Sequence, residues 1–467
     1  MISLAGFTLA VCIAHSVSRV PDPVPVRVVV DPRVELVAIV EYLSGYTLRP
    51  ALITRYDVDY KRDVESALAR LRSHRAVQLF DAMSHQGFAF DAPITAVLHC
   101  GPPPALELRT AMDESIAKRA GSTAKLDDFL SALREFASEP EFAAFLERER
   151  PAFDSIEAEG RANLGAVDAG LLELYFGETR SAYTIVLSPL LHHGGFGPRV
   201  RMPDGSIEVY SVGGPHGASD GKPTFGTRDE FRYIVWHEFG HSFVNPLVDR
   251  FGERVDRTDV LFMPLREKMR AKGYGDWRTC VNEHIVRACT TRFAFRELGD
   301  AEGKQALEGE TSNGFVHVPA LCAKLEEYER DRAKWPTLAQ FFPELVLVLQ
   351  QAATEAEKDP ALRRPRVIGT IPCAGDTAVD PALTEIVVEF DHDMDPGAFA
   401  WVQLDPAAYP KVNGEPKFLS PRTCTLQVTL ERRHAYRIGI NSGGFEGFRA
   451  KAGRAAESFE IQFRTAE

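Results

Sequence analysis

The sequence has few cysteines, no excess of positive charge and, beyond its first residues, no apolar run long enough to cross a membrane. Its 467 residues include 66 aspartates and glutamates against 54 lysines and arginines, so the formal charge is −12. Nucleic-acid-binding proteins usually present a basic face, and this balance argues against that class. A membrane helix needs about 18 consecutive apolar residues, so we expect no integral membrane segment. With 45% hydrophobic and 26% charged residues, the composition is that of a globular protein and excludes a wholly disordered chain.

Several catalytic motifs are also missing. The sequence contains no GxSxG nucleophile elbow, no GxxxxGK(S/T) phosphate loop and no GxGxxG after a strand. The cysteines form no CxxC pair and no zinc-finger spacing, so we expect them to be small buried side chains. A disulfide between Cys373 and Cys424 is an open alternative. The seven cysteines are Cys12, Cys100, Cys280, Cys289, Cys322, Cys373 and Cys424.

The N-terminal residues predict export. Residues 2–14 are nearly all apolar or small, and the first charged side chain is Arg19, which fits the apolar core of a signal peptide better than a spanning helix. We therefore predict a signal peptide over residues 1–18 and a periplasmic or extracellular protein. The segment departs from the usual pattern because no lysine or arginine precedes the apolar run. A lipid anchor on Cys12 is the second interpretation, although Val11 is larger than such a site prefers, and a buried N-terminal strand is the third.

The pattern of apolar and polar residues along the chain changes near residue 358. Residues 19–357 are mostly helical in pattern with a small sheet, residues 358–366 are typical of a linker, and residues 367–467 predict a β-sandwich of short strands. The expected fold class is α+β, a mostly helical domain followed by an all-β domain. Helices are expected over 34–45, 64–80, 126–145, 227–245 and 276–298, and strands over 183–187, 207–212, 367–368, 385–390, 423–430, 435–440 and 459–463.

One pentapeptide carries the strongest chemical signal. Residues 237–241 spell HEFGH, an HExxH motif. Residues four apart share one face of a helix, so His237 and His241 are placed to bind one metal ion, with Glu238 beside a metal-bound water. Zinc lowers the pKa of such a water toward about 7, and the glutamate takes its proton.

The helix that holds this motif is predicted independently. Thr227 and Glu230 have the spacing of a capping box at its start. Asn245-Pro246 is expected to end it, because the residue before a proline disfavours the α region. An apolar stripe runs along the helix through Phe231, Ile234, Val235 and Phe239.

A catalytic zinc ion takes three protein ligands and keeps one position open. Val244 and Leu247 exclude the metzincin pattern HExxHxxGxxH, so the third ligand must come from elsewhere. Glu283, on the helix expected over 276–298, is the preferred third ligand, since an acid among core-facing neighbours needs a partner. A salt bridge to Arg287 is the alternative interpretation of the same residue. Rival ligands are Asp249, Glu253, Asp256, Asp259 and His284.

The HEFGH motif followed by Asn282-Glu283 resembles the gluzincin group of zinc metallopeptidases. In that group two helices supply His, His and Glu to one zinc ion. The resemblance implies a zincin-like domain over residues 19–357, with His237, His241 and Glu283 on zinc and Glu238 as general base. A wider region is similar to a bacterial family, domain of unknown function 4932, through the stretches Pro32–Leu36, Gly194–Pro198, His237–Pro246 and Glu283–Ala288.

The C-terminal residues resemble bacterial Ig-like modules of exported proteins. Such modules act as spacers or adhesive domains, which implies a possible cell-surface partner for residues 367–467. The stretches that carry the likeness are Ile371–Pro381, Ile386–Phe390 and Asp393–Asp395. Asp391, Asp393 and Asp395 are expected to be solvated turn acids rather than calcium ligands, because no glycine or bidentate glutamate follows at loop spacing.

The group that stabilises the transition state is less defined. Zinc peptidases commonly place a Tyr, His or Arg near the scissile carbonyl oxygen. His192 and His193 are adjacent and diverge in direction, so they are not expected to share a metal. By resemblance, the strand over 207–212 would form the edge of the cleft and pair with an extended peptide. The candidates for the stabilising group are Tyr210, His216, His284 and Arg287.

The sequence therefore predicts an exported zinc metallopeptidase. A zinc-bound water would hydrolyse peptide bonds of a peptide or protein substrate, with Glu238 as general base. The alternative is a non-catalytic exported binding protein with a structural metal site and an adhesive Ig-like module. Glu238 favours the enzyme, because a structural site has no need of that acid. A zinc amidase acting on cell-wall peptides shares the same metal chemistry and stays open.

Overall fold

The computed structural model of the chain describes residues 24–45, 52–165, 169–451 and 453–467. The predicted signal peptide and Cys12 lie outside these residues. None of the described helices is both long and apolar enough to span a bilayer. The contacts between residues divide the chain into two compact units. One unit comprises Met1–Pro246, Cys289–Lys304 and Tyr328–Phe341, and the other comprises Leu247–Ala288, Gln305–Glu327 and Phe342–Glu467.

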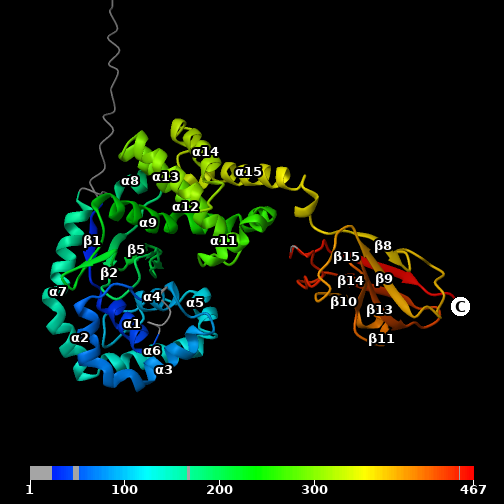
Figure 1. The fold of residues 1–467 in the computed structure, drawn as a ribbon, viewed down its shortest axis with the longest axis horizontal. Helices are drawn as coiled ribbons and strands as arrows, with labels where there is room; N and C mark the ends of the chain where they lie inside the picture. The colour runs from blue at the N-terminus through cyan, green and yellow to red at the C-terminus, as the bar shows by residue number, and fades with distance from the viewer. Residues whose placement is uncertain (1–23, 46–51, 166–168, 452) are drawn as a thin grey trace, which may run out of the picture. The chain divides into compact units, whose positions relative to one another are not determined.

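A mixed sheet lies within the first unit (Figure 1). Its order is β1-β2-β5-β3, and β4 pairs with β5 as well. β1, β2 and β5 are parallel to one another, while β3 and β4 run antiparallel to β5. The strands are β1 (Val26–Val29), β2 (Ala182–Leu187), β3 (Gly195–Phe196), β4 (Arg199–Arg201) and β5 (Ile207–Gly213), and a separate hairpin is formed by β6 (Gly217–Ser219) and β7 (Lys222–Thr224). β2 and β5 confirm the strands expected over 183–187 and 207–212.

β5 is an interior strand, because β2 lies on one side of it and β3 and β4 on the other. The cleft-edge position expected for residues 207–212 is therefore wrong. Residues 195–201 occupy the edge instead, and Tyr210 N–H donates to the Pro198 carbonyl between the two short edge strands. Glycine is uncommon inside strands, so the glycines of this segment conceal its strand character in the sequence.

Eight helices are described between β1 and α9 of the first unit. They are α1 (Pro32–Leu43), α2 (Asp59–Leu68), α3 (Arg75–Ser84), α4 (Asp91–Leu98), α5 (Glu114–Arg119), α6 (Thr123–Ala137), α7 (Pro140–Leu164) and α8 (Gly170–Phe176). α1 packs against α3, α4 and α6, and α7 packs against β1 and β2. The helix expected over 126–145 is in fact two, because Ser138 closes α6 and Pro140 begins α7. The segment expected over 64–80 likewise divides into α2, a 3₁₀ turn and α3.

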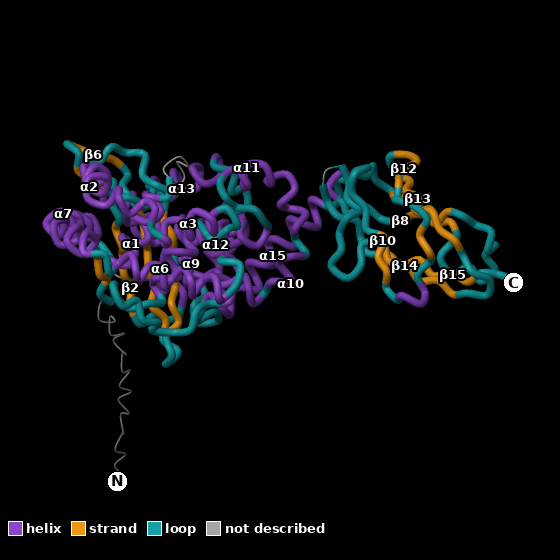
Figure 2. Tube along the Cα trace, turned by 90° about the horizontal axis from the view of Figure 1, so that it is seen from below, coloured by secondary structure: helices purple, strands orange, loops and turns teal. Residues whose placement is uncertain are grey.

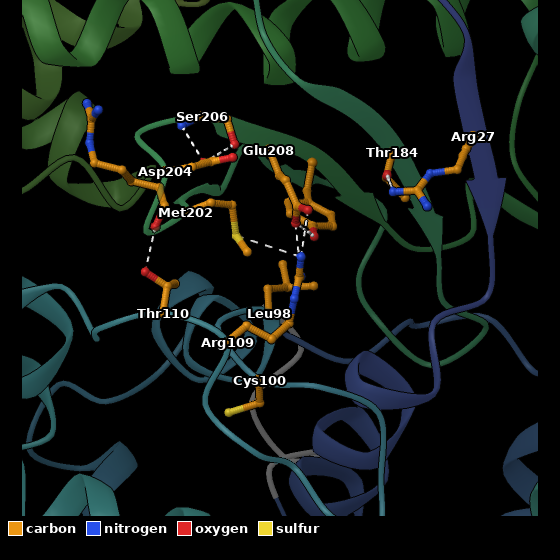
Figure 3. Close-up of polar contacts among 12 residues, drawn as sticks. Arg27, Leu98, Cys100, Arg109, Thr110, Thr184, Met202, Asp204, Ser206 and Glu208 are labelled. Atoms are coloured by element: carbon orange, nitrogen blue, oxygen red, sulfur yellow. Dashed lines mark hydrogen bonds and ion pairs between the residues drawn. The ribbon is translucent and has the colours of Figure 1, made fainter.

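A charged network fixes the loop after α4 to the sheet (Figure 3). Arg109 donates from Nη2 and Nη1 to Glu208 Oε1 and Oε2 at 2.6 and 2.9 Å. The Tyr210 hydroxyl donates to Glu208 Oε2 at 2.7 Å. Thr110 Oγ1 donates to the Arg201 carbonyl at 2.7 Å. This network engages the hydroxyl of Tyr210, one of the groups considered for transition-state stabilisation.

The helix that carries the HExxH motif, α9 (Arg228–Arg250), continues through Pro246. The predicted end at Asn245-Pro246 is therefore wrong. A proline inside a helix leaves the carbonyl four residues earlier without its usual donor. Arg180 Nη2 donates to that carbonyl, Ser242 O, at 3.0 Å, and its guanidinium stacks on the Phe243 ring at 3.8 Å. The buried arginine thus replaces the missing backbone donor and lets the helix continue.

The remaining helices are α10 (Gly252–Asp256), α11 (Arg266–Ala271), α12 (Trp277–Glu297), α13 (Asp300–Ser312), α14 (Val318–Arg330) and α15 (Leu338–Ala356). α12 confirms the helix expected over 276–298. Asp276 caps its start, because the Asp276 carboxylate accepts from Thr279 N–H at 2.9 Å.

The C-terminal residues are built from strands (Figure 2). They form two antiparallel sheets, β10-β14-β15 and β11-β13-β9-β8, with β12 also paired to β13. One apolar core, which includes Ile386, Phe390, Leu426, Ile438 and Ile461, contains residues of both sheets. The strands are β8 (Val367–Ile371), β9 (Glu385–Phe390), β10 (Trp401–Gln403), β11 (Lys411–Val412), β12 (Lys417–Ser420), β13 (Thr423–Thr429), β14 (Ala435–Ile440) and β15 (Phe459–Arg464). Helices followed by this β-rich part agree with the expected α+β class.

The cysteines and turn acids have ordinary structural roles. Among the described residues, Cys373 is an exposed free thiol, Cys424 is a buried one, and the other four described cysteines are buried free thiols as well. Asp391 accepts from Arg366 N–H, Asp393 pairs with Arg422, and Asp395 accepts from Gly397 N–H. These carboxylates serve turns and ion pairs.

Candidate metal centre

α9 begins at the predicted capping box. Thr227 N–H donates to Glu230 Oε2 at 3.0 Å, and Glu230 N–H donates back to Thr227 Oγ1 at 3.4 Å. These reciprocal bonds satisfy backbone donors that a helix start leaves unpaired. They confirm the predicted start of α9 and stabilise its first helical turn, which precedes the motif.

The two motif histidines face one another across one helical turn. Nε2 of His237 and Nε2 of His241 are 3.3 Å apart, and the two rings are nearly perpendicular. Two nitrogens that each lie about 2.0–2.1 Å from a tetrahedral zinc ion are separated by roughly 3.3–3.4 Å. The spacing of the two Nε2 atoms therefore matches one edge of a tetrahedral zinc site.

Asn245 determines the proton position on His241. His241 Nδ1 lies 3.1 Å from Asn245 Oδ1, one helical turn further along α9. An amide oxygen only accepts, so Nδ1 carries the ring proton and Nε2 presents its lone pair. This is the arrangement that metal-binding histidines usually have, with the second ring nitrogen bonded to an acceptor. Asn245 reaches His241 because α9 does not end at Pro246.

Glu283 of α12 joins the histidine pair. One ligand atom from each of His237, His241 and Glu283 lies within 4.8 Å of the other two. His237 and Glu283 are 8% and 7% exposed, so their donor atoms are largely withdrawn from water. Two imidazoles and one carboxylate form a typical donor set of a catalytic zinc ion, and the residues fit that metal.

The rival ligands do not join this cluster. Within the part of the chain that the structure describes, His237, His241 and Glu283 form the one group of three that could hold a metal ion. Asp256 pairs with Arg278, and Asp259 pairs with Arg364 and Arg454. Asp249 and Glu253 are exposed side chains. Burial lowers the pKa of His284 to about 3, and its Nδ1 lies 2.7 Å from the Cys280 carbonyl.

The alternative interpretation of Glu283 is also realised. Arg287 Nε donates to Glu283 Oε2 at 3.1 Å. The same carboxylate therefore takes part in the salt bridge and in the three-residue group.

Glu238 lies beneath the edge strand of the first unit's sheet. Glu238 is 6% exposed. A Cβ atom added at Gly195 would overlap the Glu238 carboxylate and lie 2.7 Å from its Cδ. A Cβ at Gly197 would overlap the Glu238 carbonyl oxygen and lie 3.1 Å from His241 Cβ. The absence of side chains at both positions allows the edge strand to approach the motif.

The other histidines considered lie near this strand. His192 Nδ1 accepts from Gly194 N–H at 2.9 Å, and burial together with His193 lowers the pKa of His192 to about 4. The rings of His193 and His216 are 6.3 Å apart. Burial and the neighbouring His193 lower the pKa of His216, which favours its neutral form.

Sequence reasoning missed the supporting residues. Asn245, Arg180 and Gly195 each act on the motif through a different element, and two of them are far from it in the chain. Asn245 alone carried a usable signal, because it stands four residues after His241.

Comparison with known proteins places most of the chain in one family. The family model described as Domain of unknown function (DUF4932) matches residues 26–348, which include His237, His241 and Glu283. No curated protein sequence matches the chain. The match ends before the β-rich residues 367–467.

Proposed function

The chain belongs to the DUF4932 family, and from that premise we propose that it is a zinc-dependent metallopeptidase. The observation that carries the proposal is the cluster of His237, His241 and Glu283 within 4.8 Å, with Glu238 beside the two histidines in sequence and buried under the edge strand. A structural zinc site is normally closed by four protein ligands. Three ligands and an adjacent acid fit a catalytic site instead.

Each residue has a distinct task in this proposal. His237, His241 and Glu283 hold the ion, and Asn245 keeps Nε2 of His241 as the donor atom. A bound zinc ion lowers the pKa of a coordinated water toward about 7 and polarises the substrate carbonyl. Glu238 takes the proton from the attacking water and later delivers it to the leaving amine, as a general base and then a general acid.

The edge of the sheet offers a place for an extended substrate. Residues 195–201 pair with β5 on one side, and this segment passes directly over Glu238. An extended peptide that pairs with the free side of such a strand is held by backbone hydrogen bonds. The proposed substrate is accordingly a peptide segment in extended conformation.

The remaining parts of the proposal concern export and the C-terminal part. The apolar residues 2–14 favour a signal peptide, and the two packed sheets of residues 367–467 favour an Ig-like module that contacts a cell-surface partner. Sequencing the N-terminus of the protein recovered from a secreting bacterial host tests the first point. Removal of residues 1–18 is expected.

The activity is tested by comparing the wild type with Glu238→Gln. Glutamine keeps the shape of the side chain but takes up no proton, so the variant should retain zinc and lose cleavage of an unfolded protein substrate. Asp249→Asn, which changes an exposed acid on the same helix, is the matched control and should behave as the wild type. Zinc content is measured by atomic emission, and cleavage by mass spectrometry of the products.

The results separate the alternatives. Wild type that binds zinc and cleaves, with an inactive Glu238→Gln variant that still binds zinc, supports the peptidase. Equal cleavage by both proteins removes Glu238 from the reaction. If the wild type takes up no zinc, the proposal is rejected.

A further inference from the structure

Arg287 is a partly buried cation with a partner for each of its three guanidinium nitrogens. Nε donates to Glu283 Oε2 at 3.1 Å, and Nη1 donates to both oxygens of Glu310 at 3.1 and 2.9 Å. Nη2 donates to the Tyr274 hydroxyl at 3.4 Å. The guanidinium also stacks over the Phe315 ring, 4.1 Å from its centroid. Because each nitrogen of the Arg287 guanidinium has a partner, the position of the group is fixed.

These partners come from separate elements. Glu283 and Arg287 lie one turn apart on α12, Glu310 belongs to α13, and Tyr274 belongs to the loop before α12. The side chains of Glu283, Glu310 and Arg287 are 10%, 6% and 20% exposed. A single i,i+4 ion pair on a helix surface contributes little to stability. This cluster differs from such a pair because it contains two buried acids.

The charges of the cluster do not cancel. Two carboxylates surround one guanidinium, so the cluster carries a net charge of −1 when all three groups are ionised. Arginine stays protonated in proteins, and Glu283 and Glu310 are its two acidic partners here. Because Glu310 also compensates the positive charge of Arg287, Glu283 is not the only counterion of this arginine. Glu283 therefore keeps negative charge for a cation on its other side.

The geometry also limits how Glu283 binds a metal. Its Oε2 is engaged by Arg287, which is anchored in turn by Glu310 and Tyr274. The carboxylate is thus held at Oε2 by an anchored guanidinium. A carboxylate held in this way meets a metal ion in a fixed orientation, which is the role that outer-shell partners of ligating carboxylates have.

We propose that Arg287 and Glu310 are positioning residues of the metal centre, Glu310 by compensating the charge of Arg287 and Arg287 by holding the Glu283 carboxylate in a fixed orientation. The inference rests on the proposed function, because it requires a zinc ion at His237, His241 and Glu283. It adds two residues that are not among the three ligands.

The test is the zinc affinity of Glu310→Gln, measured by competition with a chelator. Glutamine removes the compensating charge, so Arg287 should attract the Glu283 carboxylate more strongly. The dissociation constant for zinc should therefore rise by about 10–100-fold. Glu310→Asp keeps the charge and should restore part of the affinity. Tyr274→Phe removes the Nη2 partner and a hydroxyl that also interacts with Glu283, but it leaves the charges of Arg287 and Glu310 in place. It should raise the constant less than Glu310→Gln, and it serves as the second variant if Glu310→Gln does not fold.

A matched control lies on the same helix. Arg292 and Glu329 form a comparably buried pair, with Nε and Nη2 donating to Oε1 and Oε2 at 3.0 and 2.7 Å, away from the predicted ligands. Glu329→Gln should lower the unfolding temperature and leave the zinc dissociation constant unchanged. The visible spectrum of the cobalt-loaded protein gives a second readout, since it should change for Glu310→Gln and not for Glu329→Gln.

The outcomes distinguish this inference from the proposed function. If wild type binds zinc and cleaves, but a folded Glu310→Gln variant binds zinc as wild type does, the positioning roles are rejected and the peptidase stands. If Glu329→Gln weakens zinc binding as much as Glu310→Gln does, the effect is one of stability and the inference is also rejected. If wild type binds no zinc, the proposed function fails and this inference fails with it.

Discussion

The tautomer of His241 depends on a single amide. Asn245 Oδ1 accepts from Nδ1 at 3.1 Å and leaves Nε2 as the metal donor. We predict that Asn245→Ala raises the zinc dissociation constant by about 10–100-fold, because the imidazole loses the partner that fixes its proton and ring orientation. Asn245→Asp keeps an acceptor at this place and should bind zinc like the wild type. Titration of both variants against a chelator checks the prediction, which unchanged binding by Asn245→Ala would contradict.

Gly195 sets the distance between the edge strand and Glu238. An added Cβ at Gly195 would overlap the Glu238 carboxylate, so we predict that Gly195→Ala displaces the acid and abolishes most of the cleavage. Zinc content should stay at the wild-type level, because neither histidine moves. Gly213 is the register partner of Gly195, and a Cβ there would have its nearest neighbour at an ordinary 3.5 Å. Gly213→Ala is therefore the control, and equal loss of activity in both variants would remove the steric explanation.

At the residue scale, sequence spacing predicted the centre of the site and not its support. The i,i+4 repeat of His237 and His241 is a property of any helix, so their meeting follows from the sequence. Glu283 was found because the metal chemistry requires a third donor. Gly195 lies in a stretch that carries the family resemblance, but neither Gly195 nor Glu310 gave a signal for a contact with the site. Such contacts arise only after distant elements pack.

At the element scale, the end of α9 shows where local rules fail. Asn245-Pro246 is a sound signal for a helix end, because proline removes one backbone donor. Arg180 supplies that donor from a point 62 residues earlier in the chain. Such tertiary compensation is invisible to any local rule. The capping box at Thr227 needed no distant partner and was predicted correctly.

α1 contains an acid that should make stability depend on pH. Glu41 is 1% exposed, and among the described residues its Oε1 has no hydrogen-bond partner. Burial raises the pKa of Glu41 from 4.5 to about 8. The folded state therefore holds this proton more tightly than the unfolded state. Its contribution to stability is complete below about pH 4.5 and is lost as the pH rises to about 8.

Glu41→Gln tests this dependence. The amide has the same shape and no charge, so the variant should be more stable than wild type at pH 9 and equally stable at pH 4. The difference at pH 9 is at most about 5 kcal/mol, since each pKa unit corresponds to about 1.4 kcal/mol. Urea unfolding at several pH values measures it. Glu147→Gln, an exposed position on α7, is the control and should show no such trend. A pH-independent difference for Glu41→Gln would contradict the assigned cause.

At the scale of the whole molecule, composition and periodicity predicted the order of helical and β-rich parts. Alternating runs such as Glu385–Phe390 and Ala435–Ile440 coincide with β9 and β14, because one face of each strand is buried in a shared core. Strand order was not predictable, since it depends on pairings such as β9 with β13 across 30 or more residues. The two compact units were not predictable either, because segments distant in sequence assemble each of them.

The segment between α15 and β8 is held by one buried arginine. Arg454 is 5% exposed, its Nη1 donates to the Leu362 carbonyl, and its Nη2 lies 3.2 Å from Asp259 Oδ1 and 3.4 Å from Glu357 Oε1. These contacts join the β-rich part to the segment predicted as a linker. Exposed segments are the preferred sites of proteolysis unless contacts tie them down. Arg454 should therefore protect residues 358–366 from cleavage.

Trypsin measures that protection. Arg363 is exposed, while the bond after Arg364 precedes a proline and resists the enzyme, so cleavage is expected after Arg363. We predict that Arg454→Gln is cut there several times faster than wild type, because the Leu362 carbonyl loses its donor and Asp259 loses one of its two arginine partners. Arg432→Gln changes an exposed arginine of the β-rich part and should be cut at the wild-type rate. If Arg454→Gln and wild type are cut at equal rates, the loss of Arg454 has not exposed the peptide bond after Arg363. Contacts other than those of Arg454 would then protect the segment.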